Sequence, residues 1–159
     1  QRTLPTAFSK LHVMSTLGID PPGGCHFPAA GYAEFARLIC PLVERDNYGK
    51  AFTDSITPAD LKRVSITGDA HDEILLEFDQ PVNWDNALVT QFHLDGQKGK
   101  VVSGTASGNT LRLKLAGVSG AKTITYLDSA SWSQDKLLRG KNGIAAHTFC
   151  EVPISTRKP

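Results

Sequence analysis

The chain has 159 residues, a formal net charge of +1 and 21% charged residues, which is the composition of an ordinary globular protein. This balance of charges provides no basic surface for nucleic acid or for an anionic membrane. No apolar run reaches the roughly 18 residues that a transmembrane helix needs. We therefore expect neither nucleic acid nor a membrane among the partners.

The first third of the chain predicts one strand, one loop and one helix. Residues 11–16 are typical of a short strand, and residues 29–45 predict a helix. The glycine- and proline-rich loop between them brings His26 close to the start of the helix. Open α/β enzymes present catalytic groups on such loops, at the carboxyl ends of their strands. One strand and one helix cannot enclose a core, so we expect further chain upstream.

The predicted helix has an apolar stripe with helical spacing. We expect the stripe to be buried, and it consists of Tyr32, Phe35, Ala36, Ile39, Leu42 and Val43. Pro41 lacks a backbone N–H, so it predicts a kink or an early end near Cys40. Residues 46–49 contain turn formers that end the helix, and residues 51–58 are expected to be an ordered connector.

Residues 59–155 change to a period of two and predict about seven short strands separated by turns. This pattern favours an antiparallel β-sandwich with an immunoglobulin-like or fibronectin-like layout, although the Cys…Trp…Cys spacing of antibody domains is absent. The fold class is therefore mainly β. We expect one face of the strands to point inward, through Ile74, Leu76, Phe78, Leu111, Leu113, Leu115, Ile124 and Tyr126.

Three cysteines, Cys25, Cys40 and Cys150, do not form the framework of a disulfide-rich scaffold. A bridge between Cys25 and Cys40 is conceivable because they flank the predicted helix, and buried free thiols are the alternative. A metal site at Cys25, His26 and Cys40 lacks a fourth ligand and the usual spacing, so we expect neither metal nor cofactor.

Two segments carry a family resemblance. Residues 24–32 (GCHFPAAGY) and 41–49 (PLVERDNYG) resemble the C-terminal end of the sialate O-acetylesterase-like branch of the SGNH (GDSL) hydrolases. The resemblance implies a three-layer α/β/α domain that ends near residue 50, with His26 as the catalytic base. Residues 59–155 resemble the β-sandwich appended to many bacterial polysaccharide-active esterases, which implies a secreted or periplasmic bacterial protein.

The sequence also departs from that family. The serine block, the oxyanion-hole glycine and the asparagine of the family are not found in these residues. The usual acid stands three residues before the histidine, where this chain has Gly23. Asp20 is the nearest alternative acid, and a backbone carbonyl could orient the imidazole instead. As a simpler interpretation, His26 is a polar loop residue and Asp20 a turn residue.

Two functions follow. The first is the C-terminal portion of a bacterial carbohydrate O-acetylesterase, which supplies the histidine loop to an upstream segment that holds the serine, with an acetylated glycan as substrate. The alternative is an accessory β-sandwich that binds glycan or braces a catalytic domain and has no activity of its own. Trp132 stands in a polar loop and could stack on a sugar, whereas capping the sandwich core is the commoner role of such a ring.

Overall fold

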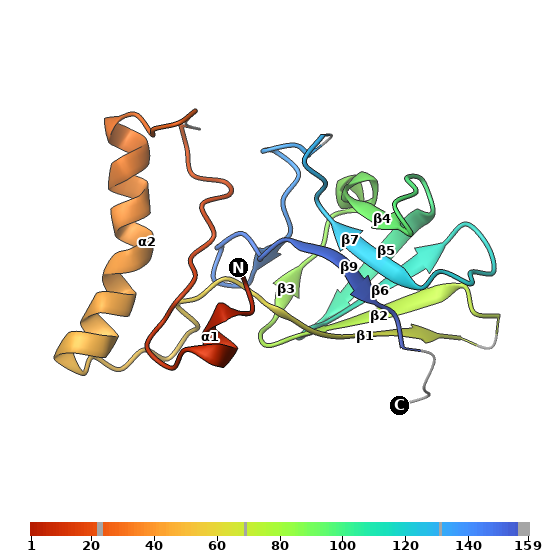
Figure 1. Cartoon of the computed structure of the whole chain (residues 1–159), viewed down its shortest axis with the longest axis horizontal. Coiled ribbons are helices and arrows are strands. Elements are labelled where there is room, and N and C mark those ends of the chain that lie inside the picture. The colour runs from red at the N-terminus through yellow and green to blue at the C-terminus, as the bar shows by residue number, and fades with distance from the viewer. Residues whose placement is uncertain (22–23, 69, 131, 156–159) are drawn as a thin grey trace.

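The computed structural model describes residues 1–21, 24–68, 70–130 and 132–155. Within these residues the chain is mainly β, as predicted, with helices α1 (Leu4–Ala7) and α2 (Ala29–Tyr48) and one 3-10 helix, η1 (Asn86–Gln91). Figure 1 shows α2 standing at one side of a body of strands. The strands are β1 (Leu61–Thr67), β2 (Glu73–Phe78), β3 (Val82–Asn83), β4 (Phe92–Leu94), β5 (Val101–Ser107), β6 (Thr110–Leu115), β7 (Thr123–Tyr126), β8 (Arg139–Gly140) and β9 (Phe149–Pro153).

The strands form two larger sheets and one two-residue ladder, and every pair of strands within them is antiparallel. The larger sheets have the orders β1-β2-β6-β5 and β4-β7-β9, while β3 pairs with β8. If the two-residue strands are set aside, seven strands remain, and lettering them A to G gives A-B-E-D and C-F-G. Constant-type immunoglobulin domains have this order. The sequence predicted about seven strands, and β3 and β8 are the two it missed.

The two sheets share one hydrophobic core. All eight side chains predicted to face inward are buried, none of them more than 4% exposed. Register explains this outcome, because β2 and β6 place Ile74 opposite Leu113 and Leu76 opposite Leu111 on the same face. The outer face of the same strands is charged, with Arg112 Nη1 3.0 Å from a Glu73 carboxylate oxygen. Alternation therefore separates a dry face from a solvated one.

Residues 11–16, predicted to be a strand, form none with the part of the chain that the structure describes. These residues have no regular secondary structure, and in the described part of the chain none of the backbone N–H groups of residues 12–16 donates a hydrogen bond. A strand gains its stability from a partner backbone, and the described residues provide none here. The segment instead runs beside α2, where Ile19, Leu38 and Ile144 form a second small core joined by Met14 and Phe35.

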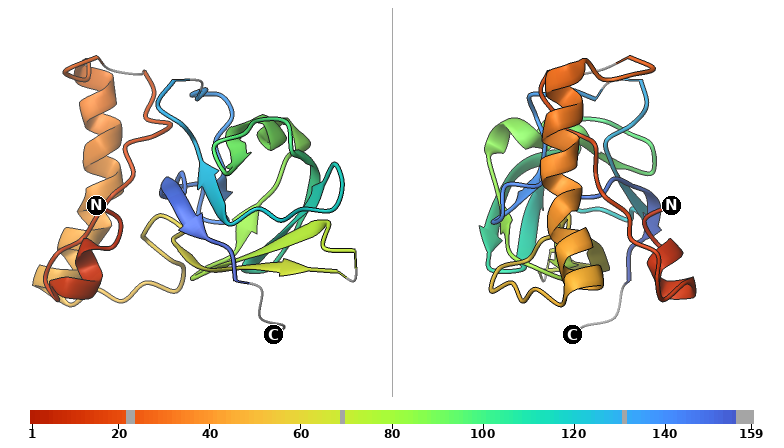
Figure 2. Two further views of the ribbon diagram at one scale, coloured as in Figure 1. Left: turned by 45° about the vertical axis from the view of Figure 1, so that its right-hand side comes forward. Right: turned by 90° about the vertical axis from the view of Figure 1, so that its left-hand side faces the viewer.

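Helix α2 does not end early at Pro41, which was one of the two outcomes predicted there, and its buried face differs from the prediction. The helix continues through Pro41 and ends at Gly49, whose left-handed φ of 68° and N–H bond to the Arg45 carbonyl form its C-terminal cap. Its buried residues are Gly31, Leu38 and Leu42. Of the predicted stripe, Leu42 is buried, whereas Tyr32 is 47% and Val43 48% exposed. Figure 2 shows why: the helix contacts a narrow extended segment and no sheet covers its outer side.

Neither of the described helices has the combined length and apolar character that crossing a bilayer requires.

Candidate functional site

His26 lies in the loop that precedes α2, and its side chain is exposed. Its Nδ1 atom is 3.4 Å from the hydroxyl oxygen of Tyr32, which belongs to the first turn of the helix. The Tyr32 ring in turn stands edge-on to Phe27, with 5.8 Å between ring centroids. The Tyr32 hydroxyl thus lies beside the imidazole, while the His26 Nε2 atom has no hydrogen-bond partner among the described residues.

Gly31 allows the histidine loop to lie close against the helix. A Cβ atom at this position would come within 3.0 Å of both the Phe27 Cβ and the Pro21 carbonyl oxygen. Real Cβ atoms rarely make contacts this short, so a larger residue would push the loop away. The absence of a side chain at Gly31 therefore allows Pro21 and Phe27 to lie against the first turn of α2.

Asp20 is not brought together with His26. Both residues are described, both are exposed, and no hydrogen bond or ion pair joins their side chains. The neighbouring Ile19 is fully buried in the small core beside α2, so this part of the loop is anchored through the preceding residue. Gly23, at the position of the usual family acid, lies outside the described residues. The predicted His26–Asp20 pair therefore stays a prediction.

A different histidine does meet a carboxylate. His12 Nε2 lies 2.7 Å from an Asp46 carboxylate oxygen, near the C-terminal end of α2. The hydrogen bond from Arg45 lowers the pKa of Asp46, and His12 adds to this effect. The pair links the extended segment to the helix across the surface. Nothing in the sequence pattern indicated it, because the partners are far apart in the chain and neither stands in a motif.

Two of the remaining histidines, His93 and His147, have structural surroundings, whereas His71 is exposed. His93 is buried, with Nε2 3.6 Å from an Asp128 carboxylate oxygen. His147 is half-buried, and burial lowers its pKa although the nearby Asp60 and Asp79 act in the opposite direction. No serine side chain forms a hydrogen bond with any of these imidazoles in the ranges that the structure describes.

The two tryptophans have different surroundings. Trp84 packs directly over Gly104, where an added Cβ would lie 2.5 Å from a ring carbon, and its Nε1 donates to Asn86 at 2.8 Å. Trp132 is 44% exposed. Its loop contacts the N-terminal part of the chain, because Gln134 Nε2 donates a hydrogen bond of 3.2 Å to the Ile19 carbonyl. Trp84 therefore packs against the sandwich core, whereas the Trp132 ring is exposed at the surface.

The three cysteines are exposed and unpaired, so the expected burial of the free thiols is wrong. Cys25 stands in the short loop before α2 and Cys40 on the outer side of that helix, where they have no core to enter. Residues 1–21, 24–68, 70–130 and 132–155 contain no cluster of three His, Cys, Asp or Glu side chains that could hold a metal ion.

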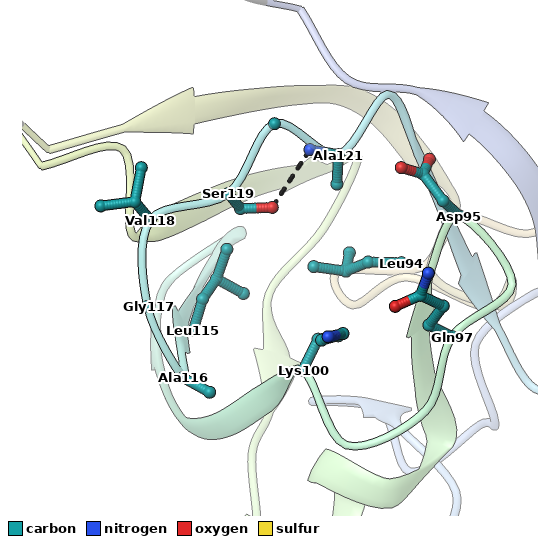
Figure 3. Close-up of a pocket in the computed structure, with 11 residues that line it drawn as sticks. Leu94, Asp95, Gln97, Lys100, Leu115, Ala116, Gly117, Val118, Ser119 and Ala121 are labelled. Atoms are coloured by element: carbon teal, nitrogen blue, oxygen red, sulfur yellow. Dashed lines mark hydrogen bonds between the residues drawn. The ribbon is translucent and has the colours of Figure 1, made fainter.

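A cavity of about 480 Å³ lies at one end of the sandwich, between the turn after β4 and the loop that joins β6 to β7 (Figure 3). Two of its polar side chains, Asp95 and Ser119, already have partners. Asp95 accepts hydrogen bonds from the Thr123 and Lys122 backbone N–H groups, which lower the pKa of its carboxyl, and Ser119 Oγ accepts from the Ala121 N–H at 3.1 Å. The cavity includes none of the predicted site residues, so it is not a candidate active site.

Comparison with solved structures finds a carbohydrate acetylesterase from Xanthomonas citri with a similar fold. The TM-score is 0.60 at 16% sequence identity, and the match covers 83% of this chain and 30% of that one. At this identity the similarity concerns the fold alone, and the chain spans less than a third of the length of its structural neighbour. No protein-family model and no curated protein matches the sequence.

Proposed function

We propose that the chain is the C-terminal portion of a carbohydrate O-acetylesterase of the SGNH type, in which His26 is the general base. The main support is the state of this side chain: it is exposed, its loop contacts α2, and its Nε2 atom has no partner among the residues that the structure describes. Nε2 is the atom that takes the proton of a serine hydroxyl in triad hydrolases, while Nδ1 faces an orienting group. The fold similarity to a carbohydrate acetylesterase supports the substrate class.

The orienting group has two candidates. If the Tyr32 hydroxyl accepts a hydrogen bond from Nδ1–H, the imidazole is held in the tautomer whose Nε2 accepts a proton. Asp20 is the other candidate, since closure of the site around a substrate commonly shortens catalytic hydrogen bonds. Substituting Tyr32→Phe and Asp20→Asn separately would distinguish them, because only loss of the orienting group should lower kcat.

The nucleophile and the oxyanion donors would come from an upstream segment. Two surfaces of the structure support such a partner. The backbone N–H groups of residues 12–16 donate no hydrogen bond within the described part of the chain, so this segment can pair with a strand. On α2, Tyr32 and Val43 are each about half exposed and could be covered by the same segment. On this proposal residues 1–50 complete the α/β/α domain, 51–58 connect, and 59–155 form an accessory immunoglobulin-like sandwich.

The test is an esterase assay on the protein extended upstream through its coding region, with His26→Asn and His71→Asn variants. His71 is an exposed loop residue with a positive φ of 50°, a conformation that asparagine tolerates. Release of acetate from an acetylated glycan should fall by about 10²–10⁴-fold in His26→Asn, the usual contribution of a general base, and stay unchanged in His71→Asn.

The 159-residue chain alone should not hydrolyse p-nitrophenyl acetate above background, because no serine stands beside His26 in the part that the structure describes. Hydrolysis of p-nitrophenyl acetate by the 159-residue chain that persists in its His26→Asn variant would contradict the proposal. Full activity of the longer protein carrying His26→Asn would contradict it as well.

A further inference from the structure

The loop between β7 and β8 carries Trp132 on an ordered turn. The Lys136 N–H donates to the Ser133 carbonyl at 3.2 Å, which closes a β-turn, and the Asp135 N–H donates to Ser133 Oγ at 3.3 Å. The Ser133 N–H donates in turn to the side chain of the buried Gln91 at 3.3 Å. The turn thus fixes the backbone that directly follows the exposed indole.

This loop lies beside the histidine loop. Gln134 bonds to the Ile19 carbonyl, and two residues further along the chain the Pro21 carbonyl packs on Gly31 in the first turn of α2. Two residues of chain span at most about 7 Å. Trp132 is therefore within about 7 Å of Gln134 along the backbone, and Ile19 is within the same distance of Pro21, measured between Cα atoms. Figures 1 and 2 show the two loops at the same end of the molecule in every view.

Groups that can bond to hydroxyls lie on the other side of the same turn. Asp135 and Lys136 line a cavity of about 270 Å³ together with Asp85 and Arg139. Ser133 and Lys136 are within about 7 Å of each other because they close the turn, and Trp132 directly precedes Ser133 in the chain. An exposed aromatic face beside carboxylates and cations suits a sugar ring, which offers an apolar face and several hydroxyls.

We infer that Trp132 and the cavity below its turn form a glycan subsite that adjoins the His26 loop, so that the sandwich holds an oligosaccharide while its acetyl group is presented to the histidine. The inference deepens the proposed function and rests on it for the role of His26. Gln134 bonds to the Ile19 carbonyl and the Pro21 carbonyl packs on Gly31 in the first turn of α2, so we assign the two side chains to neighbouring subsites. The ligand is therefore an oligosaccharide of several residues, and a monosaccharide would fill only one subsite.

The test is a titration of the 159-residue chain with xylo-, cello- and chito-oligosaccharides of several residues and with their monosaccharides, followed by NMR of the two indole N–H signals. We expect at least one oligosaccharide to shift the Trp132 signal and to bind more tightly than its monosaccharide. Trp132→Ala should weaken that binding by about tenfold, the scale of one aromatic contact. Tyr48→Ala is the matched control, since Tyr48 is an 81% exposed aromatic residue at the far end of α2.

Absence of binding by all three oligosaccharides would overturn the inference, and so would equal weakening by Trp132→Ala and Tyr48→Ala. Circular dichroism and thermal unfolding establish that both variants are folded. Binding needs no nucleophile, so its outcome is independent of the esterase assay. If the protein binds glycan through Trp132 but its hydrolysis does not depend on His26, the glycan subsite is supported and the proposed esterase mechanism is contradicted.

Discussion

The indole of Trp84 touches the backbone of strand β5 at Gly104 because no side chain intervenes. Gly104→Ala would place a Cβ 2.5 Å from a ring carbon, so Trp84 would have to shift and its packing against Phe92 would be disturbed. We expect the free energy of unfolding to fall by about 1–3 kcal/mol, the usual cost of overpacking. Urea denaturation measures this, with Gly120→Ala as control, since no atom lies within 4 Å of its added Cβ.

His147 gives the stability a predictable dependence on pH. Burial lowers its pKa in the folded state below the ordinary value of about 6.5, so the unfolded chain binds more protons between these two pKa values. Stability should therefore rise with pH through this window, and the contribution is complete above about pH 6.5. His147→Asn should flatten the pH profile of the unfolding free energy between about pH 5 and 7, whereas the exposed-site variant His71→Asn should keep the wild-type slope. Parallel profiles for wild type and His147→Asn would contradict the assignment.

At the scale of elements, α2 contains Pro41, where the sequence predicted a kink or an early end. Pro41 has no N–H to donate to the carbonyl four residues earlier, yet the helix continues for seven residues beyond it. Pro41→Ala restores that donor and should raise the free energy of unfolding by about 1–3 kcal/mol. Thermal and urea unfolding measure the change. Pro28→Ala, at the N-cap where no intrahelical bond is missing, should not raise it. A less stable Pro41→Ala protein would show that the proline fits a bend the helix needs.

The strands were predictable and the buried side of the helix was not. Alternation assigned Leu111, Leu113 and Ile124 to the core, because both layers of the sandwich are encoded in the same stretch of chain. The buried face of α2 depends on which segment packs against the helix, and an apolar residue in the helix sequence does not reveal that segment. Leu38 therefore turned inward and Val43 outward, since the described partner is the narrow segment around Ile19.

At the scale of the whole molecule, the sequence placed His26 on a loop before a helix, and the structure agrees. Its contacts were not predictable, because Tyr32 was assigned to a buried stripe and the close approach at Gly31 depends on tertiary packing. The contact between Gln134 and Ile19 joins residues more than a hundred positions apart, and no local pattern encodes it. Local signals identified the elements, and long-range contacts arranged the candidate site.

The central claim is that His26 is the base of an acyl hydrolase whose serine lies in another segment. A crystal structure of the protein extended upstream tests it most directly, through the distance from His26 Nε2 to the nearest serine oxygen. We expect about 3 Å, the reach of a general base, with residues 11–16 paired to a neighbouring strand. An imidazole buried against apolar side chains, with no serine within hydrogen-bond reach, would contradict the claim.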